Sequence, residues 1–126
     1  MQAALSVADA AICTSGTATL EVALYAVPLV VIYKVSWLTY MLGRMLIKIK
    51  HIGLCNIVTE QTVAKEFIQS QANCKNISHE IICLLNDKQY RSLRKHELHN
   101  LRQKLASGGG SHQVANIVNQ LVQDNA

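Results

Sequence analysis

The sequence predicts an α/β fold, a Rossmann-like parallel sheet with helices on both faces. Two short apolar runs, 10–13 and 29–33, have the length and the aliphatic content of buried parallel strands. Between them, residues 17–26 carry apolar side chains at helical spacing, and Pro28 ends that helix. We therefore predict that 10–33 forms strand, turn, helix and strand, joined by the right-handed crossover usual for such units.

The turn of this unit carries the residues predicted to bind a ligand. Gly16 has no Cβ, so the backbone can approach a ligand closely there. Ser15 or Thr17 is expected to cap the helix, whose free N–H groups and dipole favour an anion. Glu21 follows one helical turn later and is placed to accept hydrogen bonds from a diol attached to that anion. Phosphate plus diol describes a nucleotide. An ordinary capped helix is the alternative, because the full G-x-G-x-x-G pattern is absent.

Length, charge and cysteines restrict the class of protein. The 126 residues suffice for one domain with its own core. The net charge of +4, from 12 basic and 8 acidic residues, suits an anionic ligand, nucleic acid or a membrane surface without deciding among them. The four cysteines form no C-x-x-C pair, so we expect no metal site, and without a secretory signal we expect free thiols in a reducing cytosol.

An apolar helix is predicted over 37–49, with Ser36 as its N-cap. Two cations, Arg44 and Lys48, argue against a membrane span, since each costs about 2.5–3.5 kcal/mol at mid-bilayer. Two interpretations stay open. One is an interfacial helix with Trp37, Arg44 and Lys48 facing a membrane, and the other is a core helix with a basic outer edge.

The middle of the chain holds three further candidate residues. Residues 51–58 are expected to form a loop or short strand containing Asn56, for which a turn or cap is the ordinary role. Residues 62–70 are predicted to be helical. Glu66 and Gln69 would then share a helix face and line a cleft, with a solvated pair equally open.

The last third of the chain is predicted to be helical. We predict an amphipathic helix over 76–86, with Ile77, Ile81, Ile82 and Leu85 inward, and a charged helix over 87–104 whose basic side chains are solvated. A Gly-rich break and a final helix capped by Ser111 follow. The few aromatic residues do not alternate with basic ones, which argues against a surface for stacking bases.

Several of these strings resemble lipid-A-disaccharide synthase. The most specific are S-G-T-A-T-L-E and P-L-V-V-I-Y-K, followed in order by L-T-Y-M-L-G-R-M-L-I-K, I-G-L-C-N-I-V and K-E-F-I-Q. The resemblance runs from about Val7 to about Val122. It implies the C-terminal, UDP-binding half of a two-domain GT-B glycosyltransferase. Residues 1–126 would then be a single nucleotide-sugar-binding domain, with 108–126 as its Gly break and terminal helix.

The resemblance also implies a reaction. Such enzymes transfer diacylglucosamine from UDP-2,3-diacylglucosamine to 2,3-diacylglucosamine 1-phosphate, forming the lipid A disaccharide of Gram-negative lipopolysaccharide and releasing UDP. No metal or other cofactor is expected, because protein dipoles and cations hold the leaving charge. By this resemblance Ser15, Gly16 and Thr17 hold the phosphates, Glu21 holds the ribose and Asn56 faces the donor.

No catalytic residue is assigned, because the base and the acceptor pocket are expected in an N-terminal half that this chain lacks. The sequence departs from the family where Cys55 and Lys65 each stand in place of a Pro. Expected partners are the two lipid substrates, the missing half, the cytoplasmic face of the inner membrane and a second copy in a homodimer, but no nucleic acid. The alternative is a non-catalytic basic module that binds an anionic membrane or nucleic acid.

Overall fold

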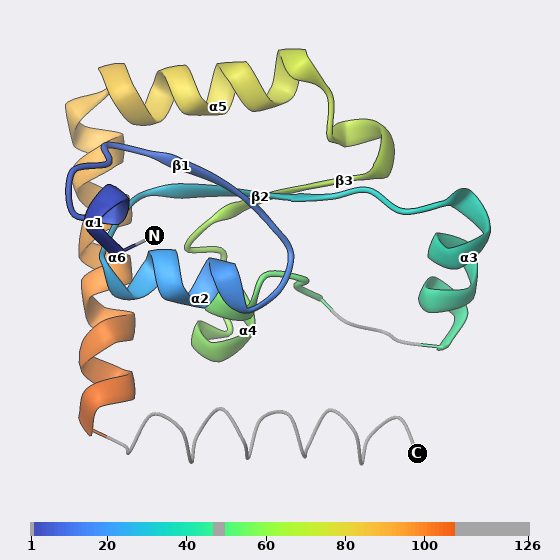
Figure 1. Cartoon of the computed structure of the whole chain (residues 1–126), viewed down its shortest axis with the longest axis horizontal. Coiled ribbons are helices and arrows are strands. Elements are labelled where there is room, and N and C mark those ends of the chain that lie inside the picture. The colour runs from blue at the N-terminus through green and yellow to red at the C-terminus, as the bar shows by residue number, and fades with distance from the viewer. Residues whose placement is uncertain (1, 47–49, 108–126) are drawn as a thin grey trace.

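A three-stranded parallel sheet forms the centre of the computed structural model, which describes residues 2–46 and 50–107 (Figure 1). The strands lie in the order β1-β2-β3, with bounds β1 Ala11–Thr14, β2 Leu29–Tyr33 and β3 Lys65–Ile68. Ala11 pairs with Leu29, and Val30 pairs with Lys65. Because all strands run the same way, the segments that follow them meet at one edge of the sheet.

The predicted strand–turn–helix–strand unit is confirmed. Helix α2, Thr17–Leu24, connects β1 to β2, which pair in parallel. The helix ends two residues earlier than predicted, because Ala26 takes a left-handed conformation with φ 54 and the chain then enters Val27 and Pro28.

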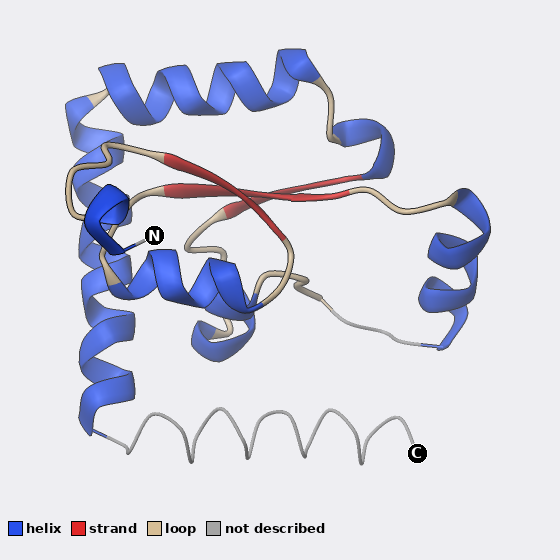
Figure 2. Ribbon diagram, viewed as in Figure 1, coloured by secondary structure: helices blue, strands red, loops and turns tan. Residues whose placement is uncertain are grey.

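Helices cover both faces of the sheet (Figure 2). Alternation along β2 separates two cores: Leu29 and Val31 belong to a cluster with α2 and with α4, Leu54–Thr59, whereas Val30 packs with Leu84 of α5, Cys74–Asn86. Helix α6, Lys88–Ser107, packs against α2, α4 and α5 and crosses the end of the sheet opposite to α3 (Figure 1). The fold class is therefore the predicted α/β arrangement.

Helix α3, Trp37–Leu46, projects from the sheet (Figure 1). Ser36 caps it as predicted, since Ser36 Oγ accepts a hydrogen bond from the Thr39 amide at 3.3 Å. Trp37 is 70% exposed and Leu42 is 53% exposed. These two side chains are therefore not part of a core in this chain. No helix in the described ranges is long and apolar enough to cross a membrane.

Two predictions for the middle of the chain are wrong. Residues 54–59 form helix α4 and not a loop or strand, and its buried Cys55 and Val58 face the core. Residues 65–68 form strand β3 and not a helix, followed by the 3₁₀ turn η1, Gln69–Gln71. A segment of four residues is too short for its apolar pattern to distinguish a strand from a helix, and pairing with β2 decides it.

Helix α5 begins earlier than predicted, and its predicted inward face is confirmed in part, since Ile77 and Ile81 pack against the core of Val30, Phe67 and Leu84. Asn73 caps it by accepting a hydrogen bond from the Asn76 amide at 2.9 Å. Glu80 and Leu84 are its buried side chains, whereas Ile82 is 54% exposed and Leu85 is 42% exposed, contrary to prediction. Glu80 is buried because its carboxylate accepts hydrogen bonds from Lys65 Nζ at 3.0 Å and from the Tyr90 hydroxyl at 2.5 Å. Periodicity of apolar residues does not reveal such a buried charged side chain.

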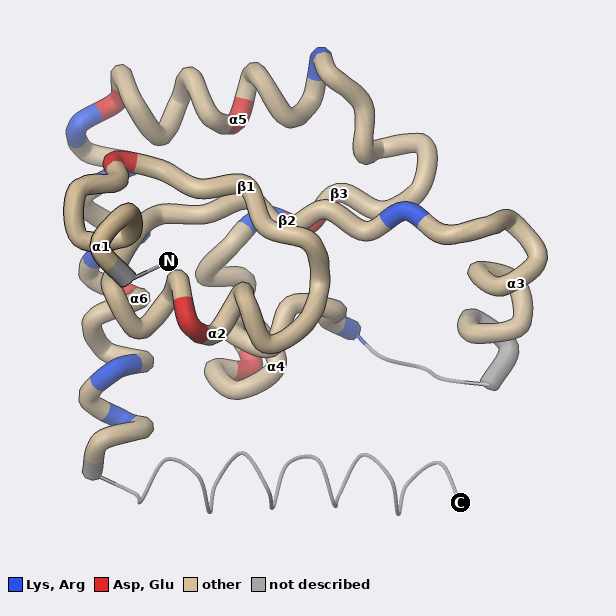
Figure 3. The backbone as a smooth tube through the Cα atoms, viewed as in Figure 1, with Lys and Arg blue, Asp and Glu red and all other residues tan. Residues whose placement is uncertain are grey.

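Helix α6 starts at the predicted charged segment and extends three residues beyond it. Asp87 Oδ1 accepts hydrogen bonds from the amides of Gln89 and Tyr90, both at 3.0 Å, and so caps the helix. Figure 3 shows basic residues spread along α6. The predicted solvated basic face is confirmed at four exposed positions, Lys88, Lys95, Arg102 and Lys104. The predicted Gly break and terminal helix, 108–126, lie outside the described residues.

Candidate functional site

The turn between β1 and α2 lies at the carboxyl edge of the sheet, where α/β folds bind ligands. Gly16 has φ +133 and ψ −164, a conformation that side chains other than glycine's rarely adopt. A Cβ built on Gly16 would meet no atom of the residues 2–46 and 50–107 within 4 Å. The structure thus shows the open approach to the backbone that the sequence predicted at Gly16.

The predicted side-chain cap of α2 is wrong. Gly16 itself is the N-cap residue, and no side chain caps the helix. The Ser15 hydroxyl donates instead to the carbonyl of Ile52 at 3.3 Å. Thr17 is exposed, so the beginning of α2 faces solvent. The first N–H groups of a helix lack intrahelical partners, and here no capping side chain competes with an anion for them.

A second segment, 52–54, supports this turn. The amide of Leu54 donates to Thr19 Oγ1 at 3.1 Å, and the Thr19 hydroxyl donates to the carbonyl of Gly16 at 2.8 Å. Thr19 is fully buried. The segment therefore contacts the turn on both sides, at Ser15 and through Thr19.

Glu66 and Asn56 form a polar cluster on the face of the sheet that α4 covers. Glu66 accepts hydrogen bonds from the amides of Ile52 and Gly53 and from Asn56 Nδ2, the last at 2.7 Å. The Asn56 side chain is fully buried, donating to Ala64 O at 2.6 Å and accepting from Ala64 N at 2.9 Å. The side-chain amide of Asn56 is thus hydrogen-bonded to Glu66 in β3 and to Ala64, the residue before β3.

Glu66 and Gln69 do not share a helix face, contrary to prediction, because Glu66 lies in a strand and Gln69 in the following turn. Gln69 bonds to both backbone groups of Val35, accepting from its amide at 2.8 Å and donating to its carbonyl at 3.0 Å. Glu66 thus anchors the segment before α4, whereas Gln69 anchors the segment before α3.

Glu21 lies in α2, one turn after Thr17, and is half-buried. Within the described ranges no hydrogen bond to its carboxylate is formed, so it is open to a ligand. Arg44 lies in α3, and Lys48 lies outside the described residues.

The cysteines do not form a reactive centre at this turn. Burial raises the pKa of the Cys55 thiol to about 12 and raises that of Cys13 as well. Such thiols stay protonated and inert near neutral pH. In the part of the chain that the structure describes, no three His, Cys, Asp or Glu side chains are grouped to hold a metal ion.

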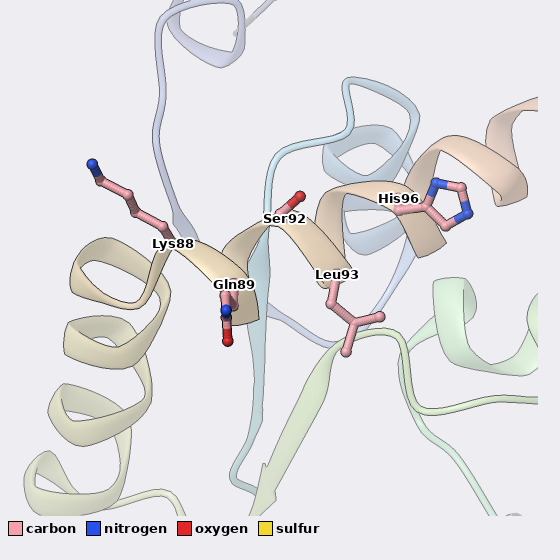
Figure 4. A pocket seen from close by; sticks show the side chains of 5 residues that line it. All are labelled: Lys88, Gln89, Ser92, Leu93 and His96. Atoms are coloured by element: carbon pink, nitrogen blue, oxygen red, sulfur yellow. The ribbon is translucent and has the colours of Figure 1, made fainter.

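A shallow surface groove lies on α6, away from this turn. Figure 4 shows its lining side chains, which all come from the one helix and spread along it: Lys88, Gln89, Ser92, Leu93 and His96. Because these side chains do not converge on a common point, the groove lacks the arrangement of a binding site.

The sequence model of the lipid-A-disaccharide synthetase family matches residues 1–120. The chain belongs to this family. It is 46% identical to a lipid-A-disaccharide synthase of Trichlorobacter lovleyi over 115 residues, 48% identical to one of Syntrophus aciditrophicus over 120, and 45% identical to one of Coxiella burnetii over 118. These matches cover 91%, 95% and 94% of this chain. The chain spans 30–31% of the length of these lipid-A-disaccharide synthases.

Sequence reasoning missed Thr19 and the segment 52–54. The available signal was Gly53, where a Cβ would lie 3.1 Å from Val31 Cγ2 and 3.3 Å from Glu66 Oε1. A glycine at such a position indicates that the backbone packs closely against the sheet. Which residues it approaches depends on long-range contacts that periodicity does not reveal.

Proposed function

We propose that this chain is the donor-binding part of a lipid-A-disaccharide synthase, a glycosyltransferase of lipid A biosynthesis. Its donor is UDP-2,3-diacylglucosamine, and the acceptor is 2,3-diacylglucosamine 1-phosphate. The observation that carries the proposal is the turn at Gly16, open above its backbone and free of a capping side chain. Membership of the family supports the assignment of substrates.

In this proposal the backbone N–H groups of Gly16 and Thr17 bind the diphosphate. The Ser15 hydroxyl donates to the Ile52 carbonyl and its amide donates to the Ile32 carbonyl, so Ser15 contributes by fixing the turn. Glu21 binds the ribose hydroxyls through its free carboxylate. The N–H groups and the helix dipole stabilise the negative charge that develops on the leaving UDP.

In this proposal Asn56 supports the site without contacting the donor. Its hydrogen bonds to Ala64 and Glu66 hold α4 against β3. A direct contact with the donor would require this buried amide to give up a partner, which is costly. Catalysis requires the rest of the enzyme, because this chain corresponds to less than a third of its relatives' length.

We also infer that α3 rests on an anionic membrane surface, such as the cytoplasmic face of the inner membrane. Trp37, Leu38 and Leu42 are more than half exposed on this helix, and the flanking Lys34 and Lys50 are exposed. Exposed apolar groups with basic residues before and after them in the chain suit the headgroup region of a bilayer. Each basic residue near an anionic leaflet contributes about 1 kcal/mol.

Vesicle sedimentation tests this membrane role. The chain should sediment with vesicles that contain phosphatidylglycerol, less so at high salt, and Trp37→Ser should weaken the salt-resistant part. Ile82→Ser is the control, since Ile82 is exposed on α5. A wild-type chain that stays in the supernatant at low salt would mean that α3 meets the remainder of the enzyme instead.

A chimera tests the enzymatic proposal. The matching segment of the Coxiella burnetii relative is replaced by this chain, and lipid A disaccharide and UDP are measured. We expect transfer by the chimera and its loss when Gly16→Val is introduced. A folded chimera that binds UDP but forms no disaccharide would contradict the substrate assignment, and one that binds no UDP would contradict the donor site.

A further inference from the structure

Glu66 occupies a position in β3 from which it reaches the segment before α4. The neighbouring Lys65 pairs with Glu80 of α5, on one side of the sheet. Side chains alternate along a strand, so Glu66 points to the other side, toward α4. Figure 1 shows α4 there, beside α2.

The carboxylate of Glu66 accepts several hydrogen bonds from one short segment. Glu66 Oε2 accepts from the Ile52 amide at 2.9 Å, and Oε1 accepts from the Gly53 amide at 2.9 Å and from Asn56 Nδ2 at 2.7 Å. Charge-assisted hydrogen bonds of this kind are stronger than neutral ones. The backbone at Gly53 is packed closely against Glu66, because a Cβ there would lie 3.3 Å from Glu66 Oε1.

The same segment holds the β1–α2 turn. The Ile52 carbonyl accepts from the Ser15 hydroxyl, and the Leu54 amide donates to Thr19, which in turn bonds to Gly16. The Ile52–Gly53 peptide unit therefore links the two sites, because its N–H donates to Glu66 and its carbonyl accepts from Ser15, and the next peptide unit donates to Thr19. A shift of this segment would move the turn from two sides.

We propose that Glu66 is a positioning residue for the diphosphate site. It fixes Ile52 and Gly53 on the sheet, so that the segment 52–54 holds Ser15 directly and Gly16 through Thr19, where the N–H groups at the start of α2 meet a diphosphate. Glu66 itself does not touch the donor. This inference rests on the proposed donor-binding function of the turn.

The test compares Glu66→Gln with wild type in the complete 126-residue chain. Glutamine keeps the size but replaces one carboxylate oxygen by an NH₂ group, which cannot accept a hydrogen bond. UDP and uridine are titrated by amide NMR, and amide exchange is followed at Ile52 and Gly53. Glu60→Gln is the matched control, because Glu60 is exposed at the end of α4 and its carboxylate has no hydrogen bond within the described ranges.

For Glu66→Gln we expect faster exchange at Ile52 and Gly53, shifted Ser15 and Gly16 resonances without ligand, and about tenfold weaker UDP binding. Uridine binding should not change, because only the diphosphate site moves. Unchanged UDP affinity would overturn the positioning role, as would an equal loss for UDP and uridine, which indicates general damage. If wild type binds no UDP, the proposed function fails, and the positioning role fails with it.

Discussion

The amide of Leu54 donates a hydrogen bond to the hydroxyl of Thr19 at 3.1 Å, although 35 positions separate them along the chain. Thr19 is fully buried in α2, and Leu54 begins α4. The contact ties a helix near the start of the chain to a segment near its middle. It therefore makes the β1–α2 turn dependent on long-range packing.

Thr19→Val should destabilise the chain. Valine has nearly the same shape but cannot accept from the Leu54 amide, which then loses its partner, or donate to the Gly16 carbonyl, which keeps only the Thr19 amide. We expect a loss of about 1–3 kcal/mol in the free energy of unfolding. Urea denaturation measures it. Thr17→Val is the control, since Thr17 is exposed in the same helix, and equal stability of the two variants would contradict a structural role of the Thr19 hydroxyl.

Gly16→Val should abolish UDP binding while the chain still folds. A Cβ there meets no atom of the described residues within 4 Å, so the cost to folding is mainly backbone strain at φ +133, about 1–3 kcal/mol. The same side chain occupies the space above the turn where the diphosphate would lie. Circular dichroism and UDP calorimetry separate the two effects.

Gly43→Val provides the matched control for that experiment. Gly43 lies in α3, where a Cβ also meets no atom within 4 Å, and its φ is not positive. UDP binding by Gly43→Val should equal that of wild type. If Gly16→Val unfolds with no separable loss of binding, Gly16 has only a structural role.

Glu21→Ala should weaken UDP binding by roughly ten- to a hundredfold, since hydrogen bonds to a charged group contribute about 1.5–3 kcal/mol. The physical reason is that the Glu21 carboxylate, one turn into α2, is free to accept hydrogen bonds from the ribose hydroxyls. Calorimetry with UDP and with 2′,3′-dideoxy-UDP forms a double-mutant cycle. In wild type, dideoxy-UDP should bind as weakly as UDP binds to the variant. Independent, additive losses would contradict the contact between Glu21 and the ribose.

Stability should fall at alkaline pH because of Cys55. Burial raises the pKa of its thiol from the ordinary 9.0 to about 12, so between these values the folded chain keeps a proton that the unfolded chain has lost. The free energy of unfolding therefore decreases as pH rises above 9, by up to about 1.4 kcal/mol per pH unit, and this contribution is constant below pH 9.

Urea denaturation across this pH range, with wild type and Cys55→Ala, measures the contribution of the thiol. The variant should lose stability less steeply with pH, and the remaining slope includes Cys13 and Tyr90. Burial raises the pKa of both, and the hydrogen bond to Glu80 raises that of Tyr90 further. Identical slopes would show that Cys55 ionises no more easily after unfolding.

The βαβ unit was predictable because each of its elements carries a local signal. The strand 29–33 is a continuous apolar run, and Pro28 separates it from the helix. Gly16 marked the turn for the same reason, since a single residue there determines the backbone conformation.

Strand β3 was not predictable from local pattern, because it consists of only four residues and pairs with β2 from more than thirty positions away. The mistaken helix then gave Glu66 and Gln69 a shared face that they do not have. Likewise, the burial of Glu80 depends on its contacts with Lys65 and Tyr90, which periodicity within α5 does not reveal. The outward Ile82 follows from helix geometry, because it lies almost opposite Leu84.

The central claim is that the turn at Gly16 binds the diphosphate of a UDP-sugar, and UDP titration of the 126-residue chain by amide NMR tests it most directly. We predict saturable binding whose largest chemical-shift changes are at Gly16, Thr17 and Ala18, with no such changes in Gly16→Val. Absence of saturable binding, or changes centred on the α6 groove of Figure 4, would contradict the claim.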